Sequence, residues 1–212
     1  MIGKFSLSRR EVLERCIAFG AVTLAGSLTP SLAAAAWEQH ERNLSPTPAC
    51  ELGPFYKRLA PNTGEMRHPG DPGMPLSISG VVYNVRGEVL PDATLELWQT
   101  DHLGHYDLEG YRYRAVLHSD SKGAYAAESV IPGHYPDRVC QHVHYLITAP
   151  GHKPLITQLY FATDPVFEGD PAKNYNRDPL ISSRELVRPV MLVGDPKDVH
   201  ASVHFELVLE KA

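Results

Sequence analysis

The sequence contains only three cysteines among its 212 residues, too few for a scaffold held together mainly by disulfides. Basic residues are not in surplus either, because 20 Lys and Arg stand against 25 Asp and Glu. The net charge of −5 argues against a broad nucleic-acid-binding surface. Sixteen glycines and 18 prolines exclude a coiled coil. What the sequence does contain is 11 histidines and 10 tyrosines, many of them between residues 102 and 160, which is compatible with a metal site.

The first 36 residues have the composition of a secretory signal. A basic start is followed by the mostly apolar segment 16–32 and by four alanines at 33–36. Arg9 and Arg10 lie in a motif that resembles the twin-arginine export signal, with Val12 at a position where Phe is usual. Glycine and proline weaken the apolar segment as a membrane span, so we expect no stable anchor, and a retained anchor is the alternative. The predicted destination is the periplasm or the extracellular medium, reached in the folded state.

The rest of the chain has the pattern of an all-β protein. Short apolar-alternating segments recur between turn signals at residues 76–82, 93–97, 142–148, 155–161, 187–193 and 203–209, with a further one at Tyr125. No segment after residue 40 has a helical period longer than about two turns. The pattern predicts a single β-sandwich, or a related barrel, of about eight short strands with long loops. Residues 37–75 are rich in Pro and Gly and predict an extended arm, so the sandwich domain is expected over 76–212.

Two histidines occupy alternate positions of one predicted strand. Side chains two residues apart on a strand point to the same face, so His142 and His144 can reach a common metal ion. The alternative is a polar pair on a solvated strand face, and the His-x-His motif by itself does not distinguish the two.

Two tyrosines in nearby loops favour the metal site. Tyr106 follows Gly104-His105, and Tyr135 lies in the sharp Pro/Gly loop that precedes the histidine strand. Two phenolates and two imidazoles suit Fe(III), because a trivalent ion lowers the phenol pKa from about 10. A copper or zinc site on the same His pair would need a third His or a carboxylate, for which we see no candidate at strand spacing.

A series of motifs follows in order over roughly residues 48–210. In chain order the motifs are Glu51-Leu52-Gly53-Pro54-Phe55-Tyr56, Gly80-Val81-Val82, Pro91-Asp92-Ala93-Thr94-Leu95-Glu96-Leu97-Trp98, Gly104-His105-Tyr106, Pro132-Gly133-His134-Tyr135-Pro136, His142-Val143-His144 and Leu155-Ile156-Thr157-Gln158-Leu159-Tyr160-Phe161. Single motifs are common, but the ordered set is specific, and it resembles the intradiol ring-cleavage dioxygenases.

The resemblance implies a non-haem Fe(III) enzyme that cleaves a catechol-type diol between its two hydroxyls with O2, giving a cis,cis-muconate-type diacid. It implies that the iron ligands are Tyr106, Tyr135, His142 and His144. It also gives Tyr135 a catalytic role, as the ligand that leaves the metal when the catechol binds and that can take up a substrate proton.

The resemblance implies further residues around the substrate. Leu52, Gly53 and Pro54 match the segment that lines the aromatic pocket, and Gln158 matches a glutamine near the site. The family usually has an arginine three residues before the first histidine, but that position is Val139 here and Arg138 lies one residue earlier. Either a one-residue bulge returns Arg138 to the pocket, where it would bind substrate and assist catalysis, or Arg138 is a surface loop residue.

A competing interpretation is a secreted, non-catalytic β-sandwich binding module, because the turn motifs around Gly87, Gly123 and Gly133 also fit such proteins. A binding module of this kind has no functional need for Tyr106 and the two histidines. Two cysteines follow the predicted signal, Cys50 and Cys140, and the sequence leaves open whether they pair or remain free thiols.

Overall fold

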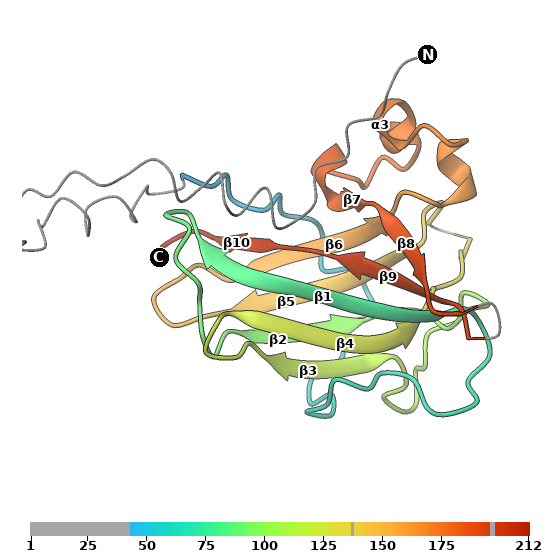
Figure 1. Cartoon of the computed structure of the whole chain (residues 1–212), viewed down its shortest axis with the longest axis horizontal. Coiled ribbons are helices and arrows are strands. Elements are labelled where there is room, and N and C mark those ends of the chain that lie inside the picture. The colour runs from blue at the N-terminus through green and yellow to red at the C-terminus, as the bar shows by residue number, and fades with distance from the viewer. Residues whose placement is uncertain (1–42, 137, 196–197) are drawn as a thin grey trace, which may run out of the picture. The chain divides into compact units, whose positions relative to one another are not determined.

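Two mixed β-sheets form a sandwich and provide the framework of the fold (Figure 1). The computed structural model describes residues 43–136, 138–195 and 198–212, so the predicted export signal at 1–36 lies outside the described residues. The strands are β1 (Pro75–Asn84), β2 (Thr94–Trp98), β3 (Arg114–His118), β4 (Ala124–Val130), β5 (His142–Thr148), β6 (Leu155–Phe161), β7 (Val187–Arg188), β8 (Val190–Val193), β9 (His200–His204) and β10 (Leu207–Leu209).

The first sheet has the order β10-β1-β9-β8, and β4 also pairs with β1. Strand β1 is antiparallel to β4 and parallel to both β9 and β10. The second sheet has the order β3-β2-β5-β6-β7, and its pairs are antiparallel except for β6 with β7. Helical structure in the described residues is confined to one segment between β6 and β7, with η1 (Pro165–Phe167), α3 (Pro171–Asn174), η2 (Tyr175–Arg177) and η3 (Arg184–Leu186). These short helices agree with the absence of a long helical period in the sequence.

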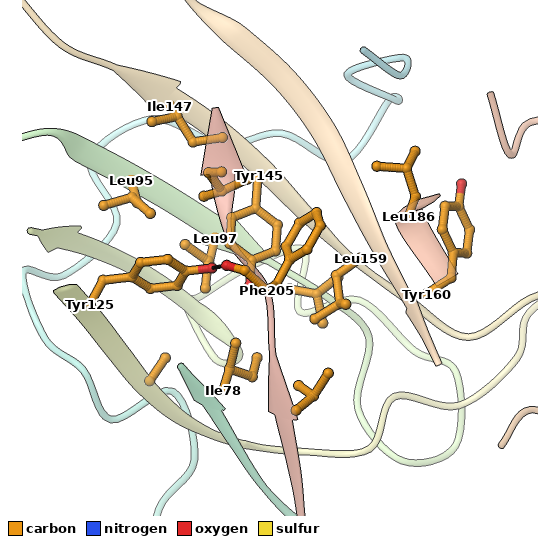
Figure 2. Packing of buried hydrophobic residues seen from close by; sticks show 14 of the residues in the cluster. Ile78, Leu95, Leu97, Tyr125, Tyr145, Ile147, Leu159, Tyr160, Leu186 and Phe205 are labelled. Atoms are coloured by element: carbon orange, nitrogen blue, oxygen red, sulfur yellow. Dashed lines mark hydrogen bonds between the residues drawn. The ribbon is translucent and has the colours of Figure 1, made fainter. Parts of the chain in front are cut away.

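The hydrophobic core lies between the two sheets, and the alternation is clearest on β1, where every second side chain is buried. Figure 2 shows Leu97 and Tyr145 of the second sheet packed near Tyr125 of the first sheet and near Phe205, which follows β9. The Tyr125 hydroxyl donates a hydrogen bond of 2.7 Å to the Phe205 carbonyl, which satisfies both groups inside the core. Gly80 permits this packing, because a Cβ there would lie 2.0 Å from the same carbonyl oxygen. Burial of each large apolar side chain stabilises the fold by about 1.5–3 kcal/mol.

The chain passes from one sheet to the other at Pro189. The prediction of one strand over 187–193 is wrong, because β7 pairs with β6 in the second sheet whereas β8 pairs with β9 in the first. Proline has no backbone N–H and cannot continue a ladder of hydrogen bonds, which explains why the strand divides at this residue.

Two further strand predictions need correction. Strand β3 has no counterpart among the predicted strands, and the predicted segment 203–209 is divided between β9 and β10. The described part of the predicted arm, residues 43–74, has no strand or helix. It is tied to the sheets by the isolated bridges Asn62–Val116 and Glu65–Glu128 and by hydrogen bonds such as that from the Cys50 N–H to the Ile156 carbonyl. Within the described ranges, no helix is both long and apolar enough to cross a membrane.

Candidate metal centre

The histidine pair lies on the outer face of the second sheet, opposite the hydrophobic core. Along β5 the side chains of Val143, Tyr145 and Ile147 belong to the core, so His142 and His144 must point the other way. In the strand register Trp98 and Gln158 flank His144 on β2 and β6. The site is therefore built on a central strand, with a paired strand on each side, and is covered by loops.

The two imidazoles direct their Nε2 atoms toward one another. The Nε2 atoms of His142 and His144 lie 3.2 Å apart. His142 Nδ1 donates to the Cys140 carbonyl over 2.8 Å, and this hydrogen bond leaves the lone pair on Nε2. Trp98 stacks on His144 with ring centres 4.8 Å apart and planes 4° from parallel, which holds the ring in place. Both side chains are almost fully buried. The short distance between their Nε2 atoms places them on one face of β5, as the sequence predicts.

Two glycines bring the tyrosine-bearing loops together. Tyr106 lies in the β2–β3 loop and Tyr135 in the β4–β5 loop. A Cβ on Gly104 would lie 1.8 Å from the His134 carbonyl oxygen, and a Cβ on Gly133 would lie 2.3 Å from the Gly104 nitrogen. No larger residue fits at either position, so these glycines allow the two backbones to touch.

Four aromatic rings consequently meet in one place. The Tyr106 and Tyr135 ring centres are 5.6 Å apart, Tyr135 is 5.7 Å from His142, and Tyr106 is 6.5 Å from His144. Phe55 stacks on Tyr106 at 4.2 Å and fixes its ring. The structure thus brings together all four residues predicted as metal ligands.

Burial controls the charge of these four groups. It lowers the pKa of His142 to about 3 and that of His144 well below its usual value, and the nearby Arg138 charge acts in the same direction on both. It raises the pKa of Tyr106 and of Tyr135. The imidazoles are therefore neutral and free to donate lone pairs, whereas the phenols need a strong local positive charge to ionise.

Arg138 is buried beside the histidines and is not a surface loop residue. Its side chain is only 7% exposed. Its Nη2 donates to Gln158 Oε1 and to the Tyr160 hydroxyl, each over 2.8 Å, and its Nε donates to Asp178 Oδ2 over 3.3 Å. The backbone N–H of Arg138 also donates to the Tyr135 carbonyl over 2.9 Å. The structure thus agrees with the interpretation that places Arg138 in the site, although Arg138 lies one residue before the position usual in the family.

The predicted pocket segment lies against the same face. A Cβ on Gly53 would lie 3.1 Å from His144 Cε1, and Gly53 has a φ of +72°, so this position requires glycine. Leu52 is half-buried and Pro54 is exposed. Gln158 Nε2 donates to the Glu51 carbonyl over 2.9 Å and ties this segment to β6. Cys50 and Cys140 are free thiols.

Sequence reasoning missed several residues of this site. Asp178 comes from the helical segment after β6, and no nearby motif marks it as a partner of Arg138. Tyr160 and Trp98 lie in quoted motifs, and their alternation with core residues on β6 and β2 indicates the outer face. Phe55 was likewise part of a motif without an assigned role.

The arrangement fits a trivalent iron ion. The Tyr106 hydroxyl is buried without a hydrogen-bond partner, although it faces the other three side chains. Unpaired buried polar atoms are rare, and a metal ligand accounts for this one. In the described residues no group of three or more His, Cys, Asp or Glu is placed to bind a metal, so the donors here are two imidazoles and two phenols. Hard phenolate oxygens with imidazole nitrogens suit Fe(III).

Comparison with known proteins agrees with this chemistry. A family model described as "Dioxygenase" matches residues 52–211. The hydroxyquinol 1,2-dioxygenase of Corynebacterium glutamicum is 28% identical over 77% of this chain and 63% of its own length. The catechol 1,2-dioxygenase of a Pseudomonas species is 33% identical over 56% and 48%, respectively. The chain therefore spans about half to two thirds of these curated relatives.

A solved structure shares the fold over a larger share of its own length. The dioxygenase domain of a dioxygenase and carbohydrate-binding protein fusion from the cellulolytic bacterium Streptomyces sp. SirexAA-E is 30% identical, with a TM-score of 0.69. The match covers 79% of this chain and 100% of that domain. Since the family match extends over most of the chain and includes the two loops and the strand β5 that build the four-ring site, the chain belongs to the intradiol ring-cleavage dioxygenases.

Proposed function

We propose that the protein cleaves the ring of a catechol-type diol between its two hydroxyl-bearing carbons, with O2, to a cis,cis-muconate-type diacid. The carbon–carbon bond breaks, and both atoms of O2 enter the two new carboxyl groups, so no external reductant is needed. The family uses non-haem Fe(III) and acts on catechol-type substrates with O2, which supports this proposal. The observation that carries it is the convergence of two neutral imidazoles and two phenols on one point, with one phenol lacking a hydrogen bond.

In this proposal Tyr106, Tyr135, His142 and His144 hold the iron. When bound, Fe(III) supplies Lewis-acid activation of the catechol oxygens. The His142 ring is fixed by its bond to the Cys140 carbonyl and the His144 ring by Trp98, so neither has to be ordered during turnover. The Tyr135 phenolate oxygen is the proposed acceptor of a substrate proton and would become a hydroxyl when it takes up that proton.

Arg138 supplies the positive charge next to the reacting ring in this proposal. Its position is set by Gln158, Tyr160 and Asp178, and these contacts keep the guanidinium oriented before substrate arrives. Such preorganised charge stabilises negative charge that develops on the substrate. Leu52, Gly53 and Pro54 would line the aromatic pocket, with Gly53 leaving room against His144.

The visible absorption spectrum of the iron-loaded protein tests this function directly. We expect a red colour from tyrosinate-to-Fe(III) charge transfer, and a shift of the band to longer wavelength when catechol is added without oxygen. Admission of O2 should then yield the ring-opened diacid with two atoms from ¹⁸O2, measured by mass spectrometry. A protein that stays colourless after aerobic iron loading contradicts the proposal, as does a product in which the ring is opened outside the two hydroxyls.

We further propose export through the twin-arginine pathway, supported by the Arg9-Arg10 motif. The double variant Arg9→Lys with Arg10→Lys is expected to remain in the cytoplasm, because the pathway reads the arginine pair. Fractionation of bacteria that express the full chain measures this, with Arg15→Lys as the control that should still be exported. Export of the double variant at the wild-type level would mean a different route.

A further inference from the structure

A second buried arginine, Arg114, lies next to Tyr106 in the candidate centre. Arg114 is the first residue of β3 and is only 3% exposed. Its Nη1 donates to the Phe55 carbonyl over 2.7 Å and its Nη2 to the Asp107 carbonyl over 3.3 Å. Its Nε is buried without a hydrogen-bond partner. The guanidinium thus contacts only neutral carbonyls.

Arg114 has no carboxylate partner among the described residues. Asp107 contributes its main-chain carbonyl, while its carboxylate accepts the backbone N–H groups of Glu109, Gly110 and Arg112. Arg138, the other buried arginine, is by contrast paired with Asp178. Burial of a cation without a nearby anion raises the free energy of the folded state, so we expect a negative group close to Arg114.

Tyr106 is the group in position to carry that negative charge. The Arg114 guanidinium lies over its ring, 5.8 Å from the ring centre. The Tyr106 hydroxyl is buried and makes no hydrogen bond of good geometry. Burial and the neighbouring Tyr135 raise its pKa, whereas the charges of Arg138 and Arg114 lower it. An ionised Tyr106 would add a negative charge directly against a guanidinium whose other nearby anion, Asp107, gives it only its main-chain carbonyl. The guanidinium would in turn stabilise the phenolate.

We propose that Arg114 is a positioning residue whose charge stabilises Tyr106 as the phenolate ligand of the metal. This inference rests on the proposed function, and it assigns a role to a residue outside the four ligands and Arg138. Two consequences follow from a nearby positive charge. It lowers the energy of the phenolate electrons, which raises the energy of the charge-transfer band, and it helps the phenol to stay ionised and bound.

The test compares two variants that differ in charge. Arg114→Gln removes the charge but keeps an N–H donor for the Phe55 carbonyl, whereas Arg114→Lys keeps the charge. In Arg114→Gln we expect the charge-transfer band of the resting Fe(III) protein to move to longer wavelength. Release of iron to a chelator should be faster by about ten- to a hundredfold, the range for loss of an outer-shell partner of a metal ligand. Arg114→Lys should stay close to wild type in both measurements.

Lys57→Met is the matched control for loop packing. Lys57 Nζ donates to the carbonyls of Glu109 and Gly110 over 2.8 and 3.0 Å, so it anchors the same loop without facing the Tyr106 ring. A role of Arg114 in loop packing alone predicts equal effects in Lys57→Met and Arg114→Gln, with no shift of the band, and would overturn the inference. Should Arg114→Gln fail to fold, Arg114→Met supplies the uncharged variant for the same two readouts.

The outcomes separate this inference from the proposed function. If wild-type protein is red and Arg114→Gln keeps both its band position and its rate of iron release, only the role of Arg114 is overturned. If wild-type protein stays colourless after iron loading, the proposed function fails and this inference fails with it.

Discussion

His144→Ala is expected to lose its iron and its dioxygenase activity together. The variant removes one of two neutral imidazoles whose Nε2 atoms lie 3.2 Å apart on β5, and no other described side chain is placed to replace it. We expect iron affinity to fall by more than about a hundredfold, beyond the usual cost of losing only an outer-shell partner. Tyr106→Phe should behave in the same way, because it removes a hydroxyl that makes no hydrogen bond and would therefore serve only the metal. Metal analysis of protein purified after iron loading measures both.

His204→Ala is the matched control, since this histidine is exposed on β9 in the first sheet and outside the site. It should bind iron like wild type. The folded state of each variant is checked by its thermal unfolding, because loss of iron through unfolding would prove nothing about ligands. Folded His144→Ala and Tyr106→Phe proteins that both retain a full complement of iron would refute the ligand assignment.

Arg138→Gln should keep its iron and yet turn over about a hundredfold more slowly, the usual cost of removing one preorganised electrostatic contact. The expected separation of iron binding from turnover follows from geometry, because Arg138 contacts Gln158, Tyr160 and Asp178 and is not one of the four converging donors. Steady-state kinetics together with the resting visible spectrum measure the two properties on one sample. The spectrum should keep its band while kcat falls.

Arg177→Gln is a suitable control for this variant. Arg177 lies in the same covering segment, but it is exposed and paired with Glu168, so its loss should leave kcat close to wild type. Loss of iron from folded Arg138→Gln would assign this arginine to metal retention instead. Unchanged kinetics would mean that another residue supplies the positive charge next to the substrate.

Strands β5 and β6, which carry the two histidines and Gln158, were predictable from local pattern, whereas the divisions between strands were not. The apolar alternation over 142–148 and 155–161 coincides with β5 and β6. The segment 187–193 has an equally good alternation, but its two halves pair with different sheets, and this depends on partners far away in the sequence. Strand β3 was missed because its five residues begin with Arg114 and end with His118, so no clear alternation is present.

The residues of the site show the same distinction between what local motifs predict and what depends on residues distant in the sequence. The ordered motifs predicted that Tyr106, Tyr135 and the His pair act together, and the structure brings them within a few ångströms. The position of Arg138 could not be settled from spacing, because it depends on Asp178, forty residues later in the chain. Arg114 gave no signal, because an arginine at the edge of a strand is usually solvated, and only the structure shows that it is buried.

The pairing of β1 has a consequence for how the protein is made. Strand β1 lies beside β9 and β10, which come more than a hundred residues later in the sequence, and is parallel to both. The first sheet therefore cannot form before residues 200–209 have been synthesised, and until then Leu76, Ile78 and Val82 lack these partners. Contacts between residues so distant in the sequence slow folding. A chain that leaves the cell only in the folded state would then have to remain in the cytoplasm until its C-terminal strands have closed the sheet.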